Sequence, residues 1–354
     1  MSRKTALAGA AALALALAGG LPAQAETYSF RVASGHPPTI IYVALMQKEF
    51  VPRLKKRLEA MGHTATFNEA YGGSLVKVAE TFEGVQDGIV EVGGFCVCFE
   101  PANLYLANWS LWMPFGPPTA TVAMKLGRAV HDHAPELTAA YEKYNQKLLA
   151  LSGTDNYGLW SKFAWKDVSE LKGRKIAGAG PNLPWVEKVG AVPVSTSAPE
   201  VYSSLSTGVY DAVVWLPFDG MGAKVYEPAP YYTVTGFGAM STLAITINLG
   251  VWNKLPAPVQ KAFAEVGREV EDLSGPWIDA AGEEVRATLV RNGAKISSIT
   301  PEAQKAWAEA LKDLPNEKAK DADTRGWPGT KALGFAVGEA ERLGHKWPVR
   351  YVIK

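Results

Sequence analysis

The chain is poor in cysteine, in net charge and in long apolar segments. It has 354 residues but only two cysteines, which excludes a disulfide-rich scaffold. Lys and Arg number 36 against 35 Asp and Glu, so no charge excess indicates a nucleic-acid or anionic-membrane partner. After residue 25, no stretch approaches the roughly 18 consecutive apolar residues that a membrane-spanning helix needs. The remaining composition, 47% hydrophobic, is that of a globular protein of about two domains.

Local motifs for catalysis and for metal binding are also absent. The sequence has no Gly-x-Ser-x-Gly, no His-Glu-x-x-His, no Walker loop and no strand-linked Gly-x-Gly-x-x-Gly. His131-Asp132-His133 has no further ligand set at useful spacing, so we expect a solvated helix end there. The sequence therefore predicts no catalytic residue, no metal and no cofactor. A periplasmic hydrolase or lyase stays an alternative, because a catalytic triad can assemble from distant positions.

Cys96 and Cys98 are separated by one residue. On an extended segment, residues this close bridge poorly. Two cysteines without further ligands nearby are also a weak metal signal. We expect two small, buried side chains.

The first 25 residues have the pattern of a secretory signal peptide. Arg3 and Lys4 precede an apolar run over residues 6–18, and Ala23-Gln24-Ala25 is a small-x-small cleavage site. The run is too short to be a stable membrane span, and no cysteine at the cleavage site could carry a lipid. This predicts export to the periplasm.

Alternating strand and helix patterns follow the leader. We expect strands at 30–33, 64–67 and 89–92, with helices over 41–61 and 75–85 between them. In a second unit, which starts near residue 152, we expect strands at 175–178, 211–215, 231–235 and 243–248. Ser197-Ala198-Pro199-Glu200 is a capping box that begins another helix. This order is typical of α/β sheets with crossover helices.

The second half contains a long helical stripe, formed by Leu255, Val259, Phe263, Val266, Val270, Leu273 and Trp277. Gly275-Pro276 interrupts the stripe, where we expect a kink or hinge. Further helices are expected near 301–314 and 330–343.

Two ordered series of residues resemble the extracytoplasmic solute receptors of tripartite ATP-independent periplasmic (TRAP) transporters, of the C4-dicarboxylate-receptor (DctP) type. The first comprises Tyr71-Gly72-Gly73-Ser74-Leu75, then residues 80–88, then Trp112-Met113-Pro114-Phe115. The second comprises residues 171–176, then 200–212, Asn248 and 252–256. The order and spacing agree over roughly residues 28–290.

The resemblance implies a two-lobed α/β clamshell braced by a long kinked helix. Lobe I would take residues 26–151, with a strand region at about 241–254 returning to it, and lobe II residues 152–240. The bridging helix would take 255–293, and helices in 294–354 would pack on the lobes. The resemblance also implies a monomeric receptor, not an enzyme, that closes on a small-molecule solute and delivers it to integral-membrane permease subunits.

The sequence departs from the family where the family binds a carboxylate. In the family, an Arg usually follows the Lys-Ile pair of lobe II, and here Ala177 follows Lys175-Ile176. A second Arg is often found in a Gly-x-Arg after the crossover, where this chain has Trp160. A buried carboxylate without such a partner would cost several kcal/mol, so a simple dicarboxylate is not the expected ligand.

Aromatic residues stand at or beside the strand ends where the resemblance places the cleft: Trp160, Trp185, Trp215, Phe218, Phe237 and, in lobe I, Phe95. Lys162 could meet one carboxylate, Asn182 and His36 could donate hydrogen bonds, and Asp219 could meet an amine. The predicted ligand is an aromatic or hydrophobic organic acid. A neutral or cationic solute held by the rings is the alternative ligand, and a sensory solute-binding module the alternative receptor role.

Overall fold

The computed structural model of the chain describes residues 25–354. The predicted signal peptide, residues 1–25, therefore lies outside the described residues except for Ala25. Within the described part, no helix combines the length and the apolar character needed to cross a membrane.

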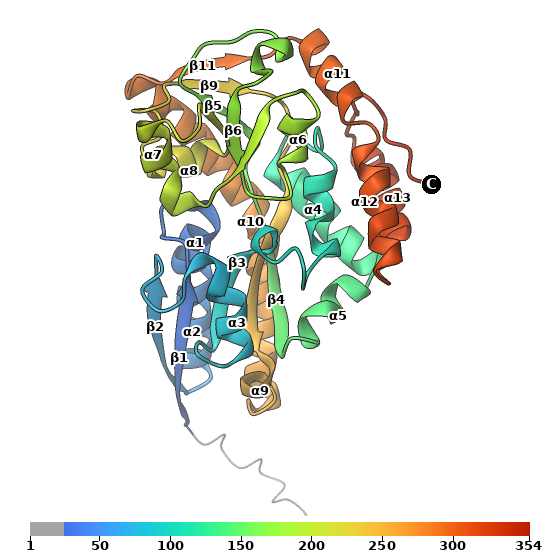
Figure 1. The fold of residues 1–354 in the computed structure, drawn as a ribbon. Helices are drawn as coiled ribbons and strands as arrows, with labels where there is room; N and C mark the ends of the chain where they lie inside the picture. The colour runs from blue at the N-terminus through green and yellow to red at the C-terminus, as the bar shows by residue number, and fades with distance from the viewer. Residues whose placement is uncertain (1–24) are drawn as a thin grey trace, which may run out of the picture.

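The first lobe is built on a five-stranded sheet (lower half of Figure 1). Its strands, in spatial order, are β2 (Thr64–Tyr71), β1 (Thr27–Ser34), β3 (Val92–Cys96), β10 (Ser241–Asn248) and β4 (Gln146–Gly153). β1 is parallel to β2 and β3, and β10 is antiparallel to both of its neighbours. The chain thus leaves this sheet after β4 and returns to it as β10.

Helices of the first lobe are α1 (Ile41–Leu45), α2 (Val51–Ala60), α3 (Thr81–Gln86), α4 (Ala120–His133), α5 (Glu136–Glu142) and α9 (Leu249–Trp252). A π-helical turn, Met46–Phe50, joins α1 to α2, so the helix predicted over 41–61 is confirmed as one helical stretch. The strand predicted at 89–92 is wrong in position, since β3 begins only at Val92.

The second lobe has a six-stranded sheet (upper half of Figure 1). Its order is β11 (Lys295–Ser298), β9 (Tyr231–Val234), β5 (Gly158–Ser161), β8 (Ala212–Trp215), β6 (Lys175–Gly178) and β7 (Val192–Ser195). Its helices are α6 (Pro184–Glu187), α7 (Ala198–Thr207) and α8 (Pro217–Gly222). The strand predicted at 175–178 is confirmed, whereas β11 was not predicted, because only four residues of weak alternation form it.

One helix, α10 (Ala257–Arg291), belongs to both lobes. Val259, Phe263 and Val266 pack in the core of the first sheet, and Val285 and Leu289 pack in the core of the second. The helix continues through Pro276 to Arg291. The chain ends in α11 (Pro301–Ala310), α12 (Leu314–Thr324) and α13 (Gly329–Arg342), of which α12 and α13 pack together along one flank (Figure 1).

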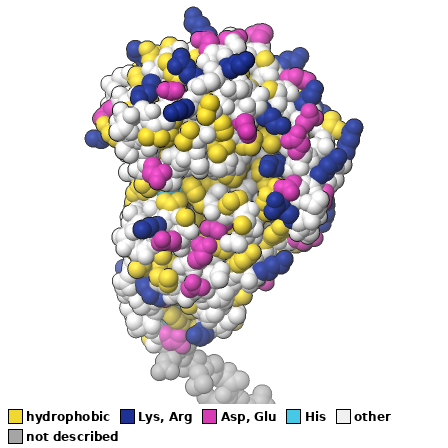
Figure 2. Space-filling view, viewed as in Figure 1, with side chains coloured by type: hydrophobic (Ala, Val, Ile, Leu, Met, Phe, Trp, Pro, Cys, Tyr) yellow, Lys and Arg dark blue, Asp and Glu magenta, His cyan; other side chains and the backbone are white. Residues whose placement is uncertain are grey.

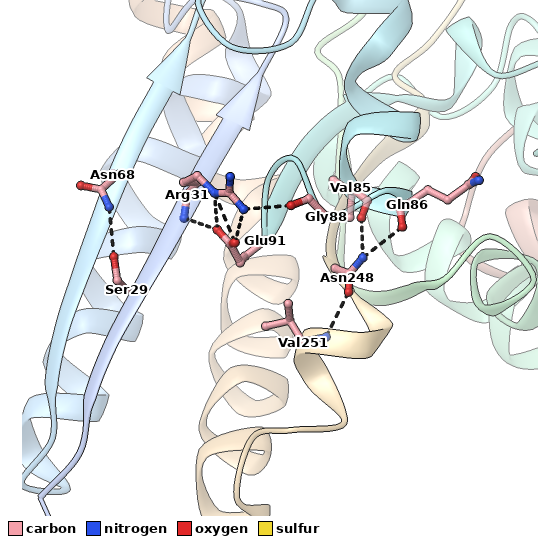
Figure 3. Close-up of polar contacts among 9 residues, drawn as sticks. All are labelled: Ser29, Arg31, Asn68, Val85, Gln86, Gly88, Glu91, Asn248 and Val251. Atoms are coloured by element: carbon pink, nitrogen blue, oxygen red, sulfur yellow. Dashed lines mark hydrogen bonds and ion pairs between the residues drawn. The ribbon is translucent and has the colours of Figure 1, made fainter.

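Side chains secure the far end of the first sheet (Figure 3). Asn248, the last residue of β10, donates through Nδ2 to the Val85 carbonyl at 2.7 Å and accepts from the Val251 amide at 3.0 Å. Arg31 pairs with Glu91 and donates to the Gly88 carbonyl at 2.8 Å. The Asn248 contacts tie the returning strand to the end of α3, and the Arg31 contacts tie β1 to the loop between α3 and β3.

Cys96 and Cys98 form a disulfide, so the expectation of two unbridged cysteines is wrong. The reason is local: β3 ends at Cys96, and Val97–Phe99 forms a 3-10 turn. That turn brings the two Cα atoms to 5.1 Å, within the range that a disulfide spans.

Candidate ligand-binding cleft

A cavity of about 580 Å³, including the part open to solvent, lies between the two lobes. We call it the inner cavity. It lies beyond the carboxyl ends of β1 and β3 in the first lobe and of β6 and β8 in the second. Open α/β sheets bind ligands at this edge, because loops and helix starts from several strands converge there. The lining residues are His36, Ile40, Ile41, Tyr42, Cys96, Cys98, Phe99, Thr154, Tyr157, Gly178, Ala179, Asn182, Thr196, Ser197, Ala198, Val201, Val213, Val214, Trp215, Leu216, Asp219 and Leu243.

The wall of the inner cavity is mainly apolar. Hydrophobic side chains also line the groove between the upper and lower parts of the molecule on the face drawn in Figure 2. Among the lining residues, none is Lys or Arg, and Asp219 is the one Asp or Glu. A carboxylate in this cavity would therefore have no guanidinium or ammonium partner in its wall.

His36 contributes to this wall a polar atom that has no hydrogen-bond partner among the described residues. Its side chain is 5% exposed, and Nδ1 lies 2.9 Å from the Tyr42 hydroxyl, which lies 2.9 Å from Ser34 Oγ. Nε2 has no hydrogen-bond partner within the described chain. Burial lowers the pKa of His36 to about 4, so the ring is neutral near pH 7. A ligand polar group would satisfy Nε2.

Two carboxyl groups meet where the lobes join. Asp219, on α8, accepts a hydrogen bond from the Ile41 amide at 2.9 Å, and this bond links the second lobe to the first turn of α1. Asp155, on the crossover after β4, accepts from the Phe218 amide at 3.3 Å. Burial raises the pKa of Asp155 to about 7, and burial together with the Asp155 charge raises the pKa of Asp219 well above its usual range. Both groups therefore favour protonation more than a surface aspartate does.

Asn182 and Tyr157 are two neutral hydrogen-bond donors in the cavity wall. Asn182 is buried, and its Oδ1 accepts from the Ala179 amide at 2.9 Å, which leaves Nδ2 without a partner among residues 25–354. Tyr157 is also buried, and its hydroxyl makes no side-chain hydrogen bond in that range. Both can donate to a ligand oxygen.

Four of the eleven residues predicted from the sequence line the inner cavity: His36, Asn182, Trp215 and Asp219. The other seven are Trp160, Trp185, Phe218, Phe237, Phe95, Ala177 and Lys162, and none of them belongs to its lining.

The indoles among these seven have partners in the core. Trp160 donates through Nε1 to the Leu216 carbonyl at 3.3 Å, and its ring packs 4.7 Å from that of Tyr232. Trp185 donates to the Leu111 carbonyl at 2.8 Å, and its ring packs 4.7 Å from that of Phe237.

The remaining four residues, apart from Phe237, also contact other parts of the protein and not the cavity. Phe95 packs on Phe82, and Ala177 is buried within β6. Phe218 packs, half-buried, among core residues. Lys162 donates to the Leu205 carbonyl near the end of α7, whereas the start of α7 faces the cavity.

Sequence reasoning missed Tyr157, Tyr42 and the two cysteines as cavity residues. Tyr157 lies on the crossover between β4 and β5. Its position shortly after the end of a strand, where cavity residues of α/β sheets are found, could have indicated that it lines the cavity. Tyr42 reaches the cavity because α1 starts immediately after the loop that follows β1.

Comparisons with a family model and with known proteins agree in identifying bacterial solute-binding proteins as similar to this chain. The family model for bacterial extracellular solute-binding protein family 7 (DctP) matches residues 44–321. The monocarboxylate 2-oxoacid-binding periplasmic protein all3028 of Nostoc sp. is 29% identical over 282 residues, which is 77% of each chain.

Solved structures share the fold. A TRAP solute-binding protein from Rhodoferax ferrireducens with copurified benzoate superposes with a TM-score of 0.80 at 17% identity, over 89% of this chain and 98% of that one. A marine metagenome TRAP protein with 3-hydroxybenzoate gives a TM-score of 0.80 at 20% identity, over the same shares. These structures are two-lobed receptors, and the predicted two-lobed α/β architecture is confirmed.

Proposed function

The chain belongs to family 7 of the bacterial extracellular solute-binding proteins, and on that basis we propose that it captures an organic acid with an apolar or aromatic body in the periplasm. Receptors of this family bind small molecules and work with TRAP permease components in the membrane. In this proposal the two lobes enclose the solute in the inner cavity, and the closed receptor delivers it to the permease.

The observation that carries the proposal is the composition of the inner cavity. Its wall is apolar, with the neutral polar groups of His36, Asn182 and Tyr157 at separate places. Such a wall favours a ring or hydrocarbon body, oriented by a few hydrogen bonds. Receptors of similar fold that carry benzoate or 3-hydroxybenzoate, and the relative named for 2-oxoacids, support an acid as the ligand. The proposed contacts are those three residues together with Trp215 and Asp219.

A thermal-shift screen of the purified protein tests the proposal. The panel contains aromatic acids, 2-oxoacids, C4-dicarboxylates and betaines. We expect the largest rise in melting temperature with an aromatic or hydrophobic monocarboxylic acid, and calorimetry should give one site per chain. Mass spectrometry should recover that acid unchanged. Conversion of the acid to a product would instead favour the alternative of a periplasmic enzyme.

A neutral or cationic solute is the second candidate ligand. The observation that favours it is the wall itself, which offers the Asp219 carboxyl group and no Lys or Arg. In the same screen, a betaine or amine that raises the melting temperature more than every acid would decide for this candidate and against the first. A shared gene neighbourhood with two permease subunits would separate transport from a sensory role.

A further inference from the structure

A second hollow adjoins the inner cavity, and we call it the outer chamber. It measures about 800 Å³ including open solvent. Its lining residues are Cys98, Phe99, Pro101, Tyr105, Asn108, Trp112, Ala179, Gly180, Pro181, Ser195 and Lys318. Cys98, Phe99 and Ala179 line both hollows, so these three residues form the boundary between them.

The boundary is made by both lobes. Gly180 has a φ of +69°, and a Cβ atom at this position would lie 4.0 Å from the Cys98 carbonyl oxygen of the first lobe. The loop after β6 therefore passes close to the turn after β3. A ligand longer than the inner cavity would have to pass between these two loops to reach the outer chamber.

Lys318, on α12, is the one Lys or Arg in the lining of either hollow. Within the described chain it forms no ion pair at 4.0 Å or less. Asp321, one turn further along α12, already accepts from the Tyr105 hydroxyl and pairs with Arg325 at 3.2 Å. Lys318 thus lines the outer chamber without a carboxylate partner in the described chain. Lys or Arg side chains are visible at the right-hand end of the groove in Figure 2.

We propose that the ligand spans both hollows, with its apolar body in the inner cavity and its carboxylate in the outer chamber beside Lys318. This inference rests on the proposed function. A carboxylate in the inner cavity would have no Lys or Arg in the wall beside it, which is unfavourable in a partly desolvated site. In the outer chamber the same group would meet an ammonium group and water. The ligand class is therefore an elongated monocarboxylic acid, such as an arylalkanoate.

Calorimetry on the purified protein with a series of ω-phenylalkanoates from benzoate to 5-phenylvalerate, each paired with its primary amide, tests the inference. We expect the longer acids to bind the unmodified protein more tightly than their amides. Lys318→Ala should weaken binding of the best acid by roughly tenfold, the usual size of a charge-assisted contact, and leave its amide unchanged. Lys318→Arg should restore most of the affinity.

Lys320→Ala is the matched control, because Lys320 is exposed on the same helix and lines neither hollow. Its affinities should equal those of the unmodified protein. Unchanged acid binding by Lys318→Ala would overturn the inference and leave the proposed function standing. Failure of every acid in the series to bind the unmodified protein would also overturn the inference, and it would overturn the proposed function only if no acid of the thermal-shift panel bound either.

Discussion

At the scale of residues, the inner cavity is distinguished by polar atoms that lack a partner. His36 Nε2 is buried without one, and the Nδ2 group of Asn182 makes no hydrogen bond in the described chain. For the buried His36 Nε2 atom, the missing hydrogen bond costs about 1–3 kcal/mol, and a ligand that supplies it regains much of that free energy. These two positions therefore discriminate between ligands by where the ligand carries its oxygen atoms.

His36→Leu should lower the affinity for the solute identified in the screen by roughly tenfold, because it removes a hydrogen bond and retains an apolar wall. Calorimetry measures this directly. His63→Leu is the control, since His63 does not line the cavity, and it should bind as the unmodified protein does. Equal affinities for the two variants would show that Nε2 does not contact the ligand.

Asp155 should make the folded state more stable in mild acid than at alkaline pH. Its pKa is about 7 in the folded protein and near 4 in the unfolded chain. The folded state therefore binds the additional proton, and this contribution is complete below about pH 4 and is lost as the pH rises through 7.

Urea unfolding from pH 4 to 8 measures the effect. As the pH rises from 4 to 8, the unmodified protein should lose a few kcal/mol of unfolding free energy relative to Asp155→Asn. Each unit of pKa difference corresponds to about 1.4 kcal/mol. His36 has the opposite sign, because its lowered pKa adds stability as the pH rises from 4 to 6.5. It is present in both proteins, so it cancels in the difference, and a difference independent of pH would contradict the assignment to Asp155.

At the scale of elements, the sequence predicts regular segments well where local signals agree. The stripe from Val259 to Trp277 predicts most of α10, and the capping box at Ser197 predicts the start of α7. The cavity was harder to predict, because it depends on turns and on contacts between lobes. Trp160 and Trp185 are side chains typical of a ligand-binding wall, but they bond to carbonyl groups in the core. Cys98, in contrast, lines the cavity because a 3-10 turn follows β3.

Gly275, a residue that normally weakens a helix, is required inside α10 by the packing of α4 against it. A Cβ atom there would lie 2.6 Å from the Thr121 Cα atom, so α10 and α4 pack backbone against backbone at this residue. Gly275→Ala should lower the unfolding free energy by about 1–3 kcal/mol, as overpacking does.

Gly282→Ala is the matched change on the same helix. Its Cβ atom would meet only the Arg286 side chain, at 3.7 Å. Alanine there should raise the unfolding free energy by up to about 1 kcal/mol through helix propensity. Denaturant titration of both variants checks the contrast, and effects of the same sign would show that close packing at Gly275 is not what requires glycine.

At the scale of the whole molecule, α10 makes the two lobes one folding unit. It contributes Phe263 to the core of the first sheet and Leu289 to the core of the second. The crossover after β4 and the return of the chain as β10 add two further covalent connections.

We therefore expect a single cooperative unfolding transition. Calorimetry should give one peak, and tryptophan fluorescence and far-UV circular dichroism should report the same midpoint. Two separated transitions, one for each lobe, would contradict a shared core along α10. Ligand should raise the single midpoint as its concentration rises, since it binds the folded state alone.

The bridge between Cys96 and Cys98 has a practical consequence for the study of this receptor. Cys98 borders both hollows, so the partition between them is held covalently only where thiols oxidise. Material produced in a reducing cytoplasm would carry a looser partition than exported material. The oxidised and the reduced protein should then differ in ligand selectivity, and calorimetry with and without a reductant measures the difference.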